Sequence, residues 1–99
     1  MNSGLLPNDL DCMKAVFAKH AGLEKVVLFG SRALGNYKQG SDVDLALFGK
    51  IDFSMVRQIK SALEEHSPLP YFFDIINYQT IENPALKKHI DSFGVQIYP

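Results

Sequence analysis

The sequence of 99 residues has one cysteine, no tryptophan and almost no excess of either charge. A single cysteine, Cys12, cannot form a disulfide within the chain, and this favours a reducing compartment such as the cytoplasm. Ten basic and eleven acidic residues leave a formal charge of −1, so no general positive field is available to attract nucleic acid. We therefore expect a cytoplasmic protein that does not bind nucleic acid directly.

Long hydrophobic runs and export signals are also missing. No stretch approaches the roughly eighteen apolar residues of a membrane span, and the first ten residues hold neither a basic region nor an apolar run suited to export. With 46% hydrophobic and 21% charged residues, the composition is that of a globular domain. We expect a single domain over residues 1–99 that has no contact with a membrane.

Helix-type and strand-type patterns alternate along the chain. Apolar residues at helical spacing predict helices over residues 8–21, 54–66 and 84–93, with a short helical stretch at 32–34, and apolar β-branched or aromatic runs predict strands over 26–29, 42–48, 71–78 and 95–98. This alternation favours a sheet covered by helices. The short connection between the first two strands indicates that not all strands are parallel. We expect an α/β (α+β) fold, with helices packed on a mixed sheet of about four strands.

Three aspartates lie on strands that are otherwise apolar. Asp42 and Asp44 stand two residues apart at the start of one strand, so their side chains leave the same face about 6.5 Å apart. Asp74 lies in the middle of the run 71–78, and it reaches the same place if its strand lies alongside at the usual spacing of about 4.8 Å. Carboxylates this close repel one another, and magnesium, a hard ion that prefers oxygen, neutralises them. The pattern predicts a site for one or two Mg²⁺ ions; the alternative for Asp74 is an edge-strand charge that faces water.

A glycine turn follows the first predicted strand. Gly30 and Ser31 come directly after it, and such a turn lets backbone N–H groups and a hydroxyl approach a phosphate closely. Arg32 adds a permanent positive charge. Together with the aspartates, the turn predicts metal-assisted chemistry in which an acceptor hydroxyl is held in line with the α-phosphate of a nucleotide. The histidines lie near helix ends or beside lysines, and we do not expect them to be ligands.

The spacing of these residues resembles a known signature. L-F-G-S-R at residues 28–32, followed by D-V-D at residues 42–44, resembles the nucleotidyltransferase signature of the DNA polymerase β superfamily. The longer stretch from residue 30 to residue 47 is similar to the minimal nucleotidyltransferase domains of prokaryotes, called MNT or MntA-like, and the likeness extends from the first helix to the C-terminus. It implies a polymerase-β-like nucleotidyltransferase fold with ATP as the substrate.

The resemblance also assigns roles to individual residues. It implies that Gly30 and Ser31 hold the triphosphate, that Asp42 and Asp44 bind the metals, and that Asp74 is a third ligand that helps to activate the acceptor hydroxyl. Many relatives carry a second basic residue where this chain has Leu34. This difference concerns the grip on the triphosphate and leaves the metal site unchanged.

Members of this family are commonly paired with a small all-helical HEPN-type protein, which is either a substrate-binding subunit or a toxin with a tyrosine that becomes adenylylated. The resemblance therefore implies an antitoxin that transfers AMP from ATP to a tyrosine of a HEPN-type partner, within a homo- or hetero-oligomer. The length of the chain agrees, because it leaves no residues for an acceptor-binding domain. Two alternatives stay open: a non-catalytic nucleotide-binding module that neutralises its partner by stoichiometric contact, and an aminoglycoside-type nucleotidyltransferase of small molecules with a separate substrate-binding subunit.

Overall fold

The computed structural model describes residues 2–99 and contains one four-stranded sheet. Its strands are β1 (Leu23–Phe29), β2 (Val43–Gly49), β3 (Phe73–Asn77) and β4 (Val95–Tyr98), and they lie in the order β3-β2-β1-β4. Strand β1 pairs antiparallel with both β2 and β4, whereas β3 runs parallel to β2. The prediction of a mixed sheet of about four strands is confirmed.

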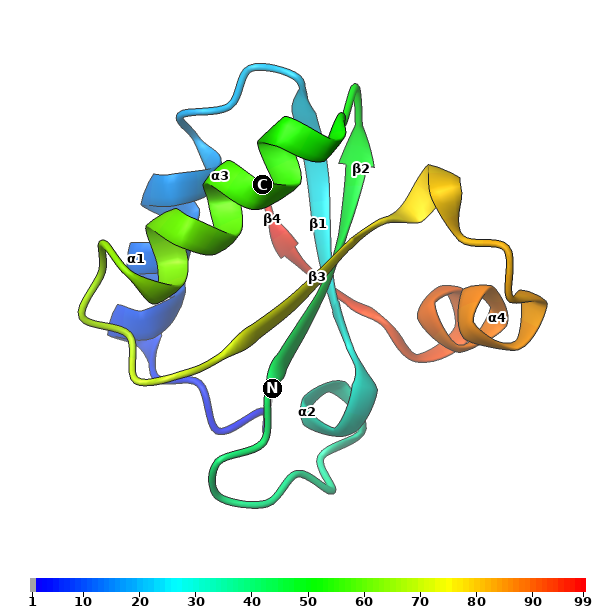
Figure 1. Ribbon diagram of the computed structural model, residues 1–99. Coiled ribbons are helices and arrows are strands. Elements are labelled where there is room, and N and C mark those ends of the chain that lie inside the picture. The colour runs from blue at the N-terminus through cyan, green and yellow to red at the C-terminus, as the bar shows by residue number, and fades with distance from the viewer. Residues whose placement is uncertain (1) are drawn as a thin grey trace.

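Helices cover the two faces of this sheet unequally. Helices α1 (Pro7–Phe17) and α3 (Phe53–Glu64) pack together on one face, and α4 (Pro84–Phe93) lies on the other (Figure 1). The five-residue helix α2 (Gly30–Leu34) follows β1 without a linker, and a 3-10 turn, η1 (Tyr78–Thr80), follows β3. None of the helices formed by residues 2–99 has the length and apolar character needed to cross a membrane.

Alternation along β2 sends its side chains into two different environments. Val43, Leu45 and Leu47 are fully buried in the main core under α1 and α3. Ala46 points to the other face and packs in a smaller cluster with Ile90 of α4. Asp44 shares that second face, and it is only half-buried there because the single helix α4 covers less of the sheet than α1 and α3 do.

The first helix differs from the prediction of residues 8–21 at both ends. It begins at Pro7, because a proline needs no N–H partner in the first turn and because the carboxylate of Asp9 accepts the N–H of Leu6 at 3.0 Å. Asp9 therefore stabilises the helix from its third position and is not the N-cap. The helix ends at Phe17, where tighter turn hydrogen bonds replace the helical ones.

Candidate active site

The parallel pairing of β2 with β3 brings two of the predicted aspartates side by side. Asp44 and Asp74 are partners in the register of the two strands, and residues opposite each other on neighbouring strands project from the same face. Asp42 lies just before β2, on the connector and not on the strand as predicted, and its negative charge acts on Asp44. The strand pairing therefore brings Asp44 and Asp74 together at one end of the sheet, with Asp42 on the connector that leads into it.

Negative charge outweighs positive charge around Asp44. Burial, the carboxylate of Asp74 and the carboxylate of Asp42, in that order of size, raise the pKa of Asp44 from 3.8 to about 6. The positive charge of Arg32 acts in the opposite direction and lowers this pKa, but by less. A carboxylate with so high a pKa is held in its charged form at neutral pH against an opposing field. A divalent cation at this position would relieve the repulsion.

The aspartates do not by themselves form a closed metal cage. Nowhere in residues 2–99 are three His, Cys, Asp or Glu side chains gathered closely enough to hold a metal ion. Their oxygen donors are nevertheless the type that Mg²⁺ prefers, and Mg²⁺ usually keeps part of its coordination for water and substrate phosphates. The residues present thus fit a magnesium ion that shares its ligands with a nucleotide.

The glycine turn lies against the aspartates. Phe29, the last residue of β1, pairs with Asp44 in the antiparallel register, so the next residue, Gly30, starts α2 beside that carboxylate. Gly30 has a φ of +75°, a conformation that favours glycine. A Cβ atom at this position would collide with the Asp44 carboxylate. The sheet therefore joins the predicted phosphate turn, which continues into Ser31, to the predicted metal site.

His89 belongs to the same site, although sequence reasoning set all three histidines aside. The backbone N–H of Gly30 donates to Nε2 of His89 at 3.0 Å, and the imidazole packs edge-on against Phe29 with ring centres 6.2 Å apart. His89 adjoins Ile90 on the face of α4 that packs on the sheet. The one available signal in the sequence is the helical spacing of Leu86 and Ile90, the two apolar residues of α4 that pack on the sheet.

Arg32 occupies a structural position. Its side chain is only 4% exposed, and its guanidinium donates to the carbonyl of Ser41 from Nε at 3.2 Å and from Nη2 at 2.9 Å, and to the carbonyl of Ser3 from Nη1 at 2.8 Å. It also lies between the rings of Tyr37 and Tyr71, 4.9 and 5.0 Å from their centres. Arg32 thus fixes the connector immediately before the first aspartate. A direct contact with a phosphate would require some of these bonds to exchange, and this role of Arg32 stays a prediction.

A cavity of about 540 Å³ lies beside the connector that leads from α2 to β2. Arg32, Tyr37 and Ser41 form one part of its wall, and Tyr71 and Phe72, the residues just before β3, form another. Its volume lies within the range of small-molecule pockets. None of the three aspartates lines it, so this cavity belongs to the connector and not to the carboxylate cluster.

Comparisons with known proteins agree with this geometry. Residues 12–99 match the family described as polymerase beta, nucleotidyltransferase. A 45-residue stretch is 40% identical to the "Putative protein adenylyltransferase MJ0604" of Methanocaldococcus jannaschii, over 44% of this chain and 45% of that relative, so less than half of the relative's length is matched.

Solved structures with low sequence identity share the fold. One is a toxin-antitoxin with AMP-PNP, which matches 90% of this chain and 72% of its own with a TM-score of 0.75 at 18% identity. Another is the toxin-antitoxin MntA-HepT, which matches 93% of this chain and 71% of its own with a TM-score of 0.70 at 16% identity. At these identities the likeness establishes a common architecture, in agreement with the fold expected from the sequence.

Proposed function

The chain belongs to the polymerase beta nucleotidyltransferase family, and on that premise we propose that it transfers AMP from ATP to a hydroxyl group of a partner protein. The single observation that carries this proposal is the pairing of Asp44 with Asp74 beside the Gly30 turn. It places two carboxylates next to a glycine turn that suits a phosphate. A relative named as a protein adenylyltransferase supports AMP as the transferred group and a protein as the acceptor.

In this proposal two groups of residues bind the triphosphate of ATP. Gly30, Ser31 and Arg32 form the turn at the triphosphate, with Arg32 acting through the connector that it holds in place. Asp42, Asp44 and Asp74 would hold one or two Mg²⁺ ions near the α-phosphate. Bound magnesium supplies charge neutralisation for the phosphates and polarises the α-phosphate.

In the proposed reaction, Asp74 is the base that accepts the proton of the acceptor hydroxyl. The acceptor oxygen forms a bond to the α-phosphorus, the bond from that phosphorus to the bridging oxygen breaks, and pyrophosphate leaves with the bonding electrons. The hydroxyl proton passes to a carboxylate oxygen of Asp74. Asp74 suits this role because it is exposed on the edge strand β3, where an incoming chain can approach it.

For the acceptor we propose a tyrosine of a small all-helical HEPN-type protein, with this chain as the antitoxin and the partner as the toxin or a substrate-binding subunit. The support is the likeness of this fold to structures described as toxin-antitoxin assemblies, one of them with AMP-PNP. A cytoplasmic setting suits this reaction, since ATP and a partner toxin meet there. The free thiol of Cys12 is compatible with such a setting.

Labelled ATP tests the transfer directly. The chain is incubated with ATP labelled at the α-phosphate, MgCl₂ and the protein encoded by the neighbouring reading frame, and the label is followed onto that protein and mapped by mass spectrometry. We expect one added AMP on a tyrosine and its loss in Asp42→Asn and Asp44→Asn variants. Undiminished labelling by either variant would contradict the assignment. Neutralisation of the partner by the double variant would instead point to a binding module without catalysis.

A further inference from the structure

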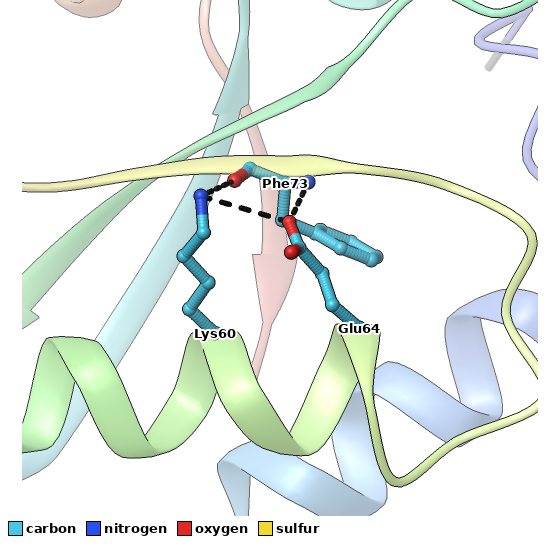
Figure 2. Close-up of polar contacts among 3 residues, drawn as sticks. All are labelled: Lys60, Glu64 and Phe73. Carbon is cyan, nitrogen blue, oxygen red and sulfur yellow. Dashed lines mark hydrogen bonds and ion pairs between the residues drawn. The ribbon is translucent and has the colours of Figure 1, made fainter.

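Strand β3 is an edge strand, and the backbone N–H and C=O of one of its residues, Phe73, are held by α3. Glu64 Oε2 accepts the backbone N–H of Phe73 at 2.7 Å, and Lys60 Nζ donates to the carbonyl of the same residue at 2.8 Å (Figure 2). The two side chains also form an ion pair of 3.6 Å one helical turn apart on α3. We call Lys60 and Glu64 the edge clamp. The clamp gives Phe73 the donor and the acceptor that a further strand would otherwise provide.

The clamp acts where the ladder between β2 and β3 cannot. The N–H of Val43 donates to the carbonyl of Phe72 at 2.9 Å, so the groups of Phe72 face β2. Because successive residues of a strand direct their N–H and C=O groups to opposite sides, those of Phe73 face the open edge. The Phe73 ring, 1% exposed, is anchored in the main core. Residue 73 is thus fixed by its side chain and by both of its peptide groups.

Asp74 follows directly in the chain, and its position depends on that peptide. Its side chain is exposed, and its contribution to the site is its placement opposite Asp44. An edge strand held from one side only can shift or fray, and a displacement of about 1 Å at a reacting group can cost up to a hundred-fold in rate. A fixed peptide at residue 73 removes this freedom.

We propose that Glu64 and Lys60 are positioning residues that hold the carboxylate of Asp74 at the metal and acceptor site through the Phe73 peptide. The inference rests on the proposed nucleotidyl transfer and adds two residues of α3, on the opposite face of the sheet, to the machinery of that reaction. Glu64 carries the larger share. Its side chain is 19% exposed against 51% for Lys60, so its hydrogen bond is better shielded from water.

The test compares Glu64→Ala with Glu64→Gln, which keeps an acceptor for the Phe73 N–H. Two readouts are followed: the affinity for Mn²⁺ as a probe metal in the presence of AMP-PNP, titrated by electron paramagnetic resonance, and the rate of AMP transfer. Glu65→Ala is the matched control, because Glu65 is the next acid in the chain, at the C-cap of α3, and its only side-chain bond among the described residues is a 3.4 Å contact with Ser61. Ile97→Val, in the core on the far strand β4, controls for a general loss of stability.

We expect Glu64→Ala to weaken Mn²⁺ binding several-fold and to slow transfer by about ten-fold or more, and we expect Glu64→Gln, Glu65→Ala and Ile97→Val to stay near wild type in both. If Glu64→Ala keeps the Mn²⁺ affinity and the transfer rate of the wild type, the inference is wrong and the proposed function is unaffected. Equal losses in Ile97→Val would also overturn the inference, because they would reflect stability and not position. A wild-type chain that binds no AMP-PNP with Mn²⁺ would overturn the proposed function, and the inference with it.

Discussion

At the level of one residue, the carboxylate of Asp44 destabilises the fold at the place where the candidate site needs a negative charge. The backbone of Asp44 pairs with β1 on one side and β3 on the other, which places its carboxylate between the Gly30 turn and Asp74. An apolar or amide side chain would give a more stable folded state, because the wild type must keep the Asp44 charge next to two other negative charges. The raised pKa is the measure of that conflict. A bound cation would relieve this repulsion, as the proposed function requires.

A pH series with Asp44→Asn tests this conflict. The pKa of Asp44 is about 6 in the folded state and 3.8 as its ordinary value, so the folded protein binds the proton more tightly, and its stability falls as pH rises from about 4 through 6. The variant lacks this loss. Near pH 4 the free energies of unfolding of variant and wild type should differ only by a constant offset. Above pH 6 the value for the variant should exceed that of the wild type by about 1 kcal/mol beyond this offset, after allowance for solvent screening.

Urea denaturation at several pH values, in EDTA, measures the difference in the free energy of unfolding between Asp44→Asn and the wild type. A difference that is constant between pH 4 and pH 7, or that favours the wild type at the higher pH, would show that the carboxylate is not strained in the folded state. Asp11→Asn on α1 serves as the control, because Asp11 is an exposed acid far along the chain from the cluster.

At the level of elements, the junction from β1 to α2 depends on glycine for two separable reasons. Gly30 and Gly40 both have a left-handed φ, of +75° and +85°, so an alanine at either position costs about 1 kcal/mol in backbone strain. A Cβ at Gly40 meets no atom within 4 Å, whereas a Cβ at Gly30 collides with the Asp44 carboxylate. The two substitutions share the strain and differ in the collision.

We therefore expect Gly40→Ala to lower the free energy of unfolding by about 1 kcal/mol and Gly30→Ala to lower it by about 2 to 4 kcal/mol. Binding of AMP-PNP with Mg²⁺ should be lost in Gly30→Ala and nearly unchanged in Gly40→Ala. Thermal or urea unfolding and calorimetric titration of the same preparations give both quantities. Equal effects of the two substitutions would mean that the turn tolerates a side chain beside Asp44.

The sequence predicts most of these elements because local patterns determine them. The alternation in residues 42–48 places Asp44 on the face opposite Val43, and the run around Asp74 forms the neighbouring strand, so their meeting follows once the two strands pair. The strand containing Asp74 begins at Phe73 and not at residue 71, with Pro70 just upstream. What the sequence alone does not predict depends on packing between distant segments. Neither the bond from Gly30 to His89 nor the burial of Arg32 has a local cause.

On the scale of the whole molecule, the site forms where the parallel and antiparallel halves of the sheet meet. Strand β2 is paired antiparallel with β1 and parallel with β3, so the end of β1 and the starts of β2 and β3 share one edge of the sheet. The glycine turn leaves from the first of these, Asp44 and Asp74 stand on the other two, and Asp42 just precedes β2. This arrangement concentrates negative charge where the proposed substrate, a polyanion, must bind.

Metal and nucleotide should therefore depend on each other for binding. Without a third gathered ligand among residues 2–99, Mg²⁺ alone should bind weakly, and without Mg²⁺ the carboxylates should repel the triphosphate. We expect EDTA to raise the Kd of AMP-PNP by at least about ten-fold, equivalent to about 1.4 kcal/mol.

The effect of Asp44→Asn on the affinity for AMP-PNP should have opposite signs in EDTA and in Mg²⁺. The amide removes one negative charge, so the variant should bind AMP-PNP more tightly than the wild type in EDTA, where repulsion dominates. In Mg²⁺ it should bind more weakly, because an ion ligand is lost. Calorimetric titrations of both proteins in both buffers form a complete set of four measurements. Weaker binding by the variant in EDTA as well would show that Asp44 contacts the nucleotide by some means other than a shared cation, and the metal-centred account of this site would have to be abandoned.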